Sequence, residues 1–194
     1  MDSRAQILKA ISKANLPSVE REVLGEFPRL DSSIERFGEL LNSIGGQLVV
    51  LDSSSSKLEF IAAHPAFGEI LRSEPESVYA ANSIGLTQVH LDSDEVNPKE
   101  FKLSILEAEF CVAENGALWV RPASLRGRLA MVSTEHLVIF SPAKIVATLH
   151  EAYSLVDIRS GGYFLSGPSK TADIEQNLVI GAQGARTLTV VLLS

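Results

Sequence analysis

Apolar strand-like runs alternate with helix-like segments along most of this chain, and this alternation limits the fold more than any other feature. The predicted strands lie at residues 47–52, 86–92, 136–142, 161–167 and 186–193, and the first is expected to be buried. The predicted helices lie at residues 3–15, 31–46, 53–64, 97–109, 143–156 and 171–184. The pattern predicts an α/β fold, a three-layer sandwich with a mostly parallel sheet between layers of helices.

One short segment breaks the alternation. Residues 110–120 hold two β-rich runs joined at Asn115-Gly116, which is the strongest short hairpin signal in a sequence. The sheet is therefore expected to be mixed. We expect an N-terminal helix and an extended connector over residues 1–30, followed by one α/β domain over residues 31–194. Asp31 or Ser32 is predicted to cap the first helix of that domain.

Composition excludes several classes of function. Acidic residues outnumber basic ones by 24 to 17, and a net charge of −7 argues against nucleic-acid binding. No apolar run is long enough to insert in a membrane, and the charged N-terminus does not resemble a signal peptide, so a cytoplasmic protein is expected.

The chain holds one cysteine, Cys111, and no Cys-x-x-Cys pair. Iron–sulfur clusters are held by several cysteine thiolates, so another subunit or a bound cofactor must carry any redox chemistry. The four histidines show no metal-ligand spacing, and neither a metal nor a cofactor of its own is predicted.

Two polar segments, Ala-Glu-Asn-Gly at 113–116 and Ser-Gly-Pro-Ser-Lys-Thr-Ala-Asp at 166–173, follow predicted strands. If both edges face the same way, the two segments would form one crevice. The second segment would bind an anion at the start of the predicted helix. The candidate ligands there are Ser166, Gly167, Ser169, Lys170 and Thr171, with Asp173 or Glu175 facing the crevice. In the alternative interpretation, Asp173 only caps the helix together with Gln176.

Glu114 is the candidate catalytic residue, as a base or nucleophile beside Asn115 and Gly116. It is alternatively an exposed residue of the hairpin turn. His136 and Arg186 are candidate ligand-binding residues at the starts of two strands, and Arg186 would hold a carboxylate with two parallel hydrogen bonds. The alternatives are a structural role for His136 and an ion pair with a surface acid for Arg186.

Residues 166–193 resemble the C-terminal signature of the lactate-utilisation protein C family, also called the LUD domain. Residues 113–120 resemble a second signature of that family, and the strand introduced by His136 fits as well. This chain departs from the signatures at Asn115, Ala117, Gln183 and Ala185. The resemblance implies a Rossmann-like core similar to that of the isomerase, deaminase and CoA-transferase group. It also implies a non-redox component of a lactate-oxidising system whose iron–sulfur clusters belong to partner subunits.

Three functions therefore stay open. The first is the lactate-utilisation component, which would bind a small anionic ligand or partner iron–sulfur subunits. The second is an independent enzyme on a phosphorylated or acyl (CoA-type) substrate, with Glu114 as base or nucleophile. The third is a ligand-free scaffold. A homo-oligomer is compatible with each of them.

Overall fold

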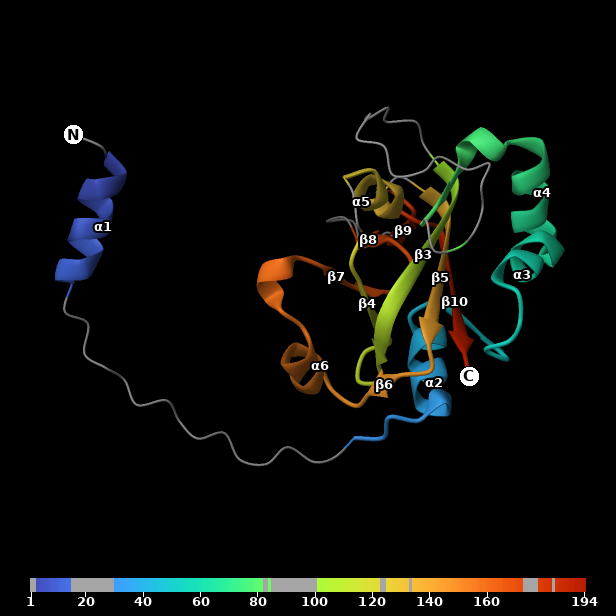
Figure 1. The fold of residues 1–194 in the computed structure, drawn as a ribbon, viewed down its shortest axis with the longest axis horizontal. Helices are drawn as coiled ribbons and strands as arrows, with labels where there is room; N and C mark the ends of the chain where they lie inside the picture. Colours follow the sequence, from blue (N-terminus) through green and yellow to red (C-terminus); the bar gives the residue numbers. More distant parts are fainter. Residues whose placement is uncertain are drawn as a thin grey trace.

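A computed structural model of the chain describes residues 3–14, 30–81, 84, 101–122, 125–132, 134–172, 178–182 and 184–194. Its centre is an eight-stranded sheet with the order β1-β10-β5-β3-β4-β7, in which β2 and β6 also pair with β3 (Figure 1). The strands are β1 Gln47–Leu51, β2 Val78–Ala80, β3 Phe101–Val112, β4 Ala117–Val120, β5 Thr134–Pro142, β6 Ile145–Val146, β7 Tyr163–Ser166 and β10 Thr187–Leu193. All neighbours are parallel except that β4 runs antiparallel to β3 and β7.

Helices pack on both faces of this sheet. The helices are α1 Ser3–Lys13, α2 Ile34–Ser43, α3 Lys57–Ala63, α4 Pro65–Ser73, α5 Leu125–Val132 and α6 Leu149–Leu155, with short 3-10 turns at Pro75–Ser77 and Ile158–Ser160. Leu137 and Ile139 of β5 pack in one core with α2 and α5, whereas Val138 and Phe140 pack in a second core with α3 and α4. Because consecutive strand residues point to opposite faces, these helices form two layers. The predicted α/β sandwich with a mostly parallel, mixed sheet is confirmed.

The predicted hairpin is also confirmed. β3 and β4 pair antiparallel around the turn at 113–116, and Cys111 lies opposite Leu118. The side chain of Asn115 accepts a 3.1 Å hydrogen bond from the Ala117 N–H, and Gly116 has a φ of 65°. Glycine adopts such a left-handed conformation without the steric cost that other residues incur, which explains why the turn forms here.

The predicted helix at 97–109 is wrong, because residues 101–109 belong to the long strand β3. Lysine, leucine, glutamate and alanine favour helices in isolation. The apolar residues Phe101, Leu103 and Ile105 instead recur every second position, and both faces of β3 are covered by core residues. Burial in the sheet therefore outweighs local propensity.

Two other helix predictions also need correction. The helix predicted at 143–156 starts only at Leu149, because Ile145–Val146 pairs with β3 as β6. The helix predicted at 171–184 is wrong: β8 Lys170–Ala172 and β9 Leu178–Ile180 form an antiparallel two-stranded sheet. Residues that pair between β8 and β9 lie farther apart in the sequence than the residues of one helical turn. A local pattern of side chains therefore does not reveal this pairing.

Smaller differences concern the first part of the domain. Ser33 caps α2 in place of Asp31 or Ser32, since its hydroxyl accepts a 3.1 Å hydrogen bond from the Arg36 N–H. The strand at 47–52 exists as β1, but it is an exposed or half-buried edge strand and is not buried. The predicted strand at 86–92 and most of the predicted connector lie outside the described residues. No helix in the described part of the chain is long and apolar enough to cross a membrane.

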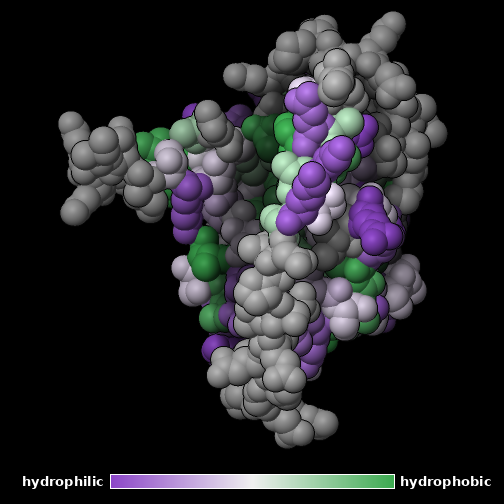
Figure 2. Space-filling model, turned by 90° about the vertical axis from the view of Figure 1, so that its left-hand side faces the viewer, coloured by the Kyte–Doolittle hydropathy of each residue, from purple (hydrophilic) through white to green (hydrophobic). Residues whose placement is uncertain are grey.

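Helix α1 forms as predicted, but it buries no residue. Ile7, Leu8 and Ile11 form an apolar stripe that is exposed along its whole length. Figure 2 faces the side of the molecule that carries α1, and green apolar side chains lie there among purple polar ones.

Candidate functional site

The two polar turns singled out in the sequence lie side by side. β4 and β7 pair antiparallel, so Ala117 lies opposite Ser166, and the turns before β4 and after β7 emerge together. The Ser166 hydroxyl donates a 2.7 Å hydrogen bond to the backbone carbonyl of Asn115. We call residues 113–116 and 166–170 the turn pair. Its existence follows from strand direction, because β3 and β7 run the same way on either side of β4.

The end of helix α2 packs against both turns. A Cβ atom built on Gly116 would lie 3.1 Å from Ile44 Cδ1 and 3.2 Å from the Leu41 backbone, and one on Gly167 would lie 3.0 Å from the Ile44 carbonyl oxygen. Both glycines have positive φ, 65° and 76°. Glycine is thus required twice, for the backbone conformation and for the close approach of Ile44.

The charged side chain of Lys170 also contacts the end of α2. Its Nζ donates a 2.6 Å hydrogen bond to the Ile44 carbonyl oxygen at the C-terminus of α2. The last carbonyls of a helix have no partner within the helix and carry partial negative charge, so a lysine there is favourable. Lys170, which the sequence predicts as the cation for an anionic ligand, is therefore hydrogen-bonded to a helix end in this structure.

Glu114 has a corresponding position at a helix start. Its Oε2 accepts a 2.7 Å hydrogen bond from the N–H of Leu149, the first residue of α6. Thr148 caps the same helix, with its hydroxyl accepting from the Glu151 N–H at 3.1 Å. A carboxylate at a helix N-terminus satisfies a free N–H group and interacts favourably with the helix dipole. Glu114 therefore fastens α6 to the turn pair.

The rest of the Ser-Gly-Pro-Ser segment is held by its backbone. The Ser169 N–H donates to the Ala185 carbonyl at 2.8 Å, and its carbonyl accepts from the Gly181 N–H at 2.9 Å. Thr171 is exposed on β8 opposite Val179. Because β8 follows this segment, the helix N-terminus expected to attract an anion does not occur at residues 171–172. Asp173, Glu175 and Gln183 lie outside the described residues.

His136 and Arg186 lie at the amino ends of β5 and β10. The contacts that the structure gives for their side chains are with residues outside the turn pair. The His136 Nδ1 is 2.8 Å from the Thr187 hydroxyl, and its ring meets that of Phe67 edge-on at 5.9 Å between centroids. The Arg186 guanidinium pairs with Glu135 at 3.2 Å. The ion pair with a surface acid is therefore the interpretation of Arg186 that the structure supports.

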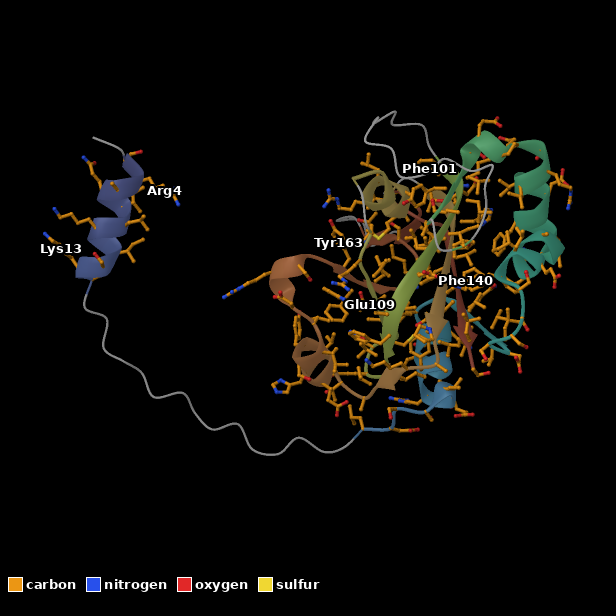
Figure 3. All side chains as sticks on the ribbon, viewed as in Figure 1. Arg4, Lys13, Phe101, Glu109, Phe140 and Tyr163 are labelled. Carbon is orange, nitrogen blue, oxygen red and sulfur yellow. The ribbon has the colours of Figure 1, made fainter. Side chains whose placement is uncertain are left out.

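Three charged pairs on β3 were not predicted from the sequence, and one of them joins Lys102 to Glu74. Lys57 pairs with Glu107 and lies 5.6 Å from the centroid of the Phe140 ring, and Arg121 pairs with Glu109. Glu109 and Phe140 are labelled in Figure 3 on neighbouring parts of the sheet. The local sequence pattern places Glu107 and Glu109 on a predicted helix at 97–109. The strand periodicity from Phe101 onward is the signal that would have placed them on a strand.

Cys111 is buried in β3, with its Sγ 3.4 Å from the Ser141 hydroxyl. Burial raises the pKa of this thiol to about 12, partly offset by the hydrogen bond that the thiol makes to Ser141. The thiol is therefore protonated and poorly nucleophilic near neutral pH. Within the described ranges, no group of three or more histidine, cysteine, aspartate or glutamate side chains is arranged to hold a metal ion.

Comparison with known proteins matches the chain to a family. A family model described as LUD domain matches residues 6–193. Lactate utilization protein C 1 of Bacillus mycoides (strain KBAB4) is 32% identical over 95 residues, covering 44% of this chain and 41% of that protein. Lactate utilization protein C of Bacillus pumilus (strain SAFR-032) is 24% identical over 148 residues, covering 72% of this chain and 60% of that protein. The matches thus span less than two thirds of the length of these relatives.

A solved structure shares the fold. The crystal structure of a DUF162 family protein from Deinococcus radiodurans superposes with a TM-score of 0.58 at 14% sequence identity, covering 83% of this chain and 96% of that chain. At this identity, the likeness supports the α/β architecture and carries no conclusion about the chemistry of the turn pair.

Proposed function

This chain belongs to the LUD domain family, and on that premise we propose that it is a non-redox component of a lactate-utilisation system. The observation that carries the proposal is the family match over residues 6–193, together with relatives that are named for lactate utilisation. Those relatives are matched over part of their length only, so their activity is extended to this chain as a proposal.

The cysteine content supports the non-redox part. The one cysteine of the chain is buried and protonated, whereas an iron–sulfur cluster needs several cysteine thiolates. Iron–sulfur subunits that associate with this chain would carry the electrons taken from lactate. The chain would then serve to assemble or position those subunits.

We propose the turn pair as the surface that meets such a partner. Its turns are fixed by bonds to two helix ends, from Lys170 to Ile44 and from Leu149 to Glu114. Glu114 and Ser166 are exposed at this rigid site. A rigid, exposed surface suits docking of a protein. A small anion would have to compete with the Ile44 carbonyl for the Lys170 ammonium, so protein docking is the better match.

Deletion of the gene in its host tests the proposal. We expect growth on lactate to be lost while growth on glucose is unchanged, and we expect the intact gene to restore it. A tagged copy of the chain should also recover an iron–sulfur protein from cells grown on lactate. Unchanged growth on lactate after deletion, without recovery of such a protein, would contradict the proposal.

The surface is tested separately. Ser166→Lys introduces a long cation at the exposed turn, and Ser73→Lys introduces the same charge at the exposed end of α4 as a matched control, because the Ser73 hydroxyl also donates to a backbone carbonyl. We expect the first change to abolish recovery of the partner and the second to leave it intact, with both proteins folded by circular dichroism. Equal recovery with both variants would move the docking surface away from the turn pair.

A further inference from the structure

The sheet ends at β1, and the outer edge of this strand is open in the described part of the chain. β1 lies at the end of the strand order and pairs with β10 alone. Its sequence, Gln-Leu-Val-Val-Leu, has no charge and no proline. Proteins usually protect edge strands with lysine, proline or a bulge, because an unprotected edge pairs with other strands. β1 has none of these features, and Val50, next to its central residue, is 46% exposed.

The hydrogen bonds next to β1 show which backbone groups face outward. The Ser194 N–H donates to the Leu51 carbonyl, and the Ser53 N–H donates to the Ser194 carbonyl. Leu51 therefore points its backbone groups toward β10. Because this direction alternates along a strand, Gln47 and Val49 also point toward β10, and Leu48 and Val50 point their N–H and C=O groups away from the sheet.

We propose that β1 is a self-association edge, on which a second copy of this chain pairs its own β1 antiparallel across a two-fold axis through Val49. In that register, Leu48 of one copy lies opposite Val50 of the second copy. These are the residues with outward backbone groups, so each N–H meets a C=O in the hydrogen-bonded geometry of antiparallel strands. The same strand thus serves as both halves of the interface, as a two-fold dimer requires.

Side chains and charge agree with this register. Val50 loses its exposure by packing beside Leu48 of the second copy, which is also apolar. Asp52, the first charged residue after β1, lies opposite Gly46 of the second copy and not opposite another acid. The opposite edge of the sheet, β7, is a poorer candidate. It is four residues long, and glycines with positive φ, Gly161 and Gly167, stand just before and just after it.

The dimer is expected to be weak and sensitive to salt. Pairing of one short strand buries a small area, which is typical of transient interfaces. Each copy carries a net charge of −7, and repulsion between the copies is screened as ionic strength rises. The dissociation constant should therefore be about micromolar and should fall with added salt.

Sedimentation of the full chain at concentrations of about 1–100 μM measures the dissociation constant and so tests the interface. It is compared between two variants in which the replaced valines are exposed to nearly the same extent. Val50→Lys places a charge at the outer edge, and Val179→Lys makes the same change at a 45% exposed valine of β9. We expect Val50→Lys to raise the dissociation constant at least about tenfold, since a lysine protects an edge strand, and Val179→Lys to leave it unchanged. A wild-type monomer at all concentrations, or equal association of both variants, would overturn the proposal.

A cross-link tests the register. Val49 faces its own copy in the second chain as a non-hydrogen-bonded pair with a Cα separation of about 4.5 Å, which a disulfide can span. Val49→Cys should therefore form a covalent dimer on mild oxidation. Gln47→Cys lies opposite Leu51 and should not. Should Val49→Cys fold poorly, protection of the wild-type Leu48 and Val50 amides from hydrogen exchange at high but not low concentration gives the same test. Exchange that does not depend on concentration would count against the edge.

Discussion

Lys170 donates a hydrogen bond to the carbonyl of Ile44, a residue 126 positions earlier in the chain, and so fastens the C-terminal family signature to the end of α2. Gly116 and Gly167 press against the same residue. The turn pair is therefore a structural joint between α2, α6 and the β4–β7 ribbon. If the turn pair also binds a partner, the same residues serve stability and binding. Variants of the turn pair must therefore be tested for stability and for function separately.

Replacing Lys170 with methionine keeps most of the side-chain length and removes the charge. We expect the free energy of unfolding to fall by about 1 kcal/mol, because the Ile44 carbonyl loses a charge-assisted hydrogen bond at an exposed site. Urea denaturation measures the change. Lys9→Met on the exposed helix α1 is the control and should leave the midpoint unchanged. An unaltered midpoint for Lys170→Met would mean that water replaces the bond at no cost.

Glu114 separates the structural and catalytic interpretations. Glu114→Gln retains an oxygen that can accept from the Leu149 N–H, whereas Glu114→Ala removes it. We expect the alanine variant to lose about 1 kcal/mol of stability and the glutamine variant clearly less, as for other helix caps. Growth on lactate should persist with glutamine. If a turnover on an acyl-CoA or sugar phosphate is found and glutamine abolishes it in a stable protein, Glu114 is catalytic after all.

Gly116 provides a test of the packing at Ile44. Gly116→Ala adds a Cβ about 3 Å from α2 and also strains a positive φ, so we expect a loss of about 2–4 kcal/mol. Gly161→Ala is the matched control, because Gly161 has a φ of 74° and open space around it. It should lose only about 1 kcal/mol from the backbone strain. Equal losses in thermal or urea unfolding would show that α2 yields to the added methyl group.

The predictable part of the fold is the part encoded locally. The hairpin at Asn115-Gly116 depends on residues next to each other, and the strand at 136–142 on a run of apolar residues. The helix predicted at 97–109 fails because its residues favour a helix alone, while burial between two helical layers imposes β3. The start of α6 was misplaced at residue 143, although Thr148 and Glu151 have the spacing of a capping box and mark the true start.

The sequence predicts the two turns of the candidate site and leaves open whether they meet. They meet because β3 and β7 run the same way on either side of β4, which is a matter of strand topology. The contacts within the joint were not accessible, because Lys170 and Glu114 meet backbone groups of Ile44 and Leu149. A backbone group has no sequence signature, so a pattern of side chains cannot indicate it. The anion-binding argument relied on a helix at 171–184 and loses that support.

His64 makes stability depend on mildly acidic pH. Its Nδ1 accepts a 3.4 Å hydrogen bond from the Phe67 N–H at the start of α4, and its ring stacks on Phe67. Burial, and to a lesser extent the charge of His136, lowers the pKa of His64 from its usual value. The folded protein therefore binds fewer protons than the unfolded chain, and stability falls as pH falls below the usual histidine pKa of about 6.5.

Denaturation at several pH values between about 7 and 5 measures this loss. In His64→Asn, the cap is kept without a titrating group, so the decline of stability with acid should be smaller than in the wild type. Ser73→Ala, at an exposed position of the same helix α4, changes no titrating group and serves as the control, which should retain the wild-type slope. Identical slopes for all three proteins would assign the acid sensitivity to other groups.

Cys111 governs stability at the alkaline end. The pKa of its thiol is about 12 in the folded protein, against 9.0 for the exposed group. The folded state thus holds a proton that the unfolded state loses above pH 9, and stability should fall by up to about 1.4 kcal/mol per pH unit between these values. Urea unfolding at pH 8, 9 and 10 measures the slope, with Cys111→Ala as the variant without the thiol.

At pH 8 the native protein should also resist a thiol reagent that modifies the unfolded chain at once. Rapid modification of the native protein would show that β3 opens near Ser141 often enough to expose the thiolate, and the alkaline slope would then be smaller than expected.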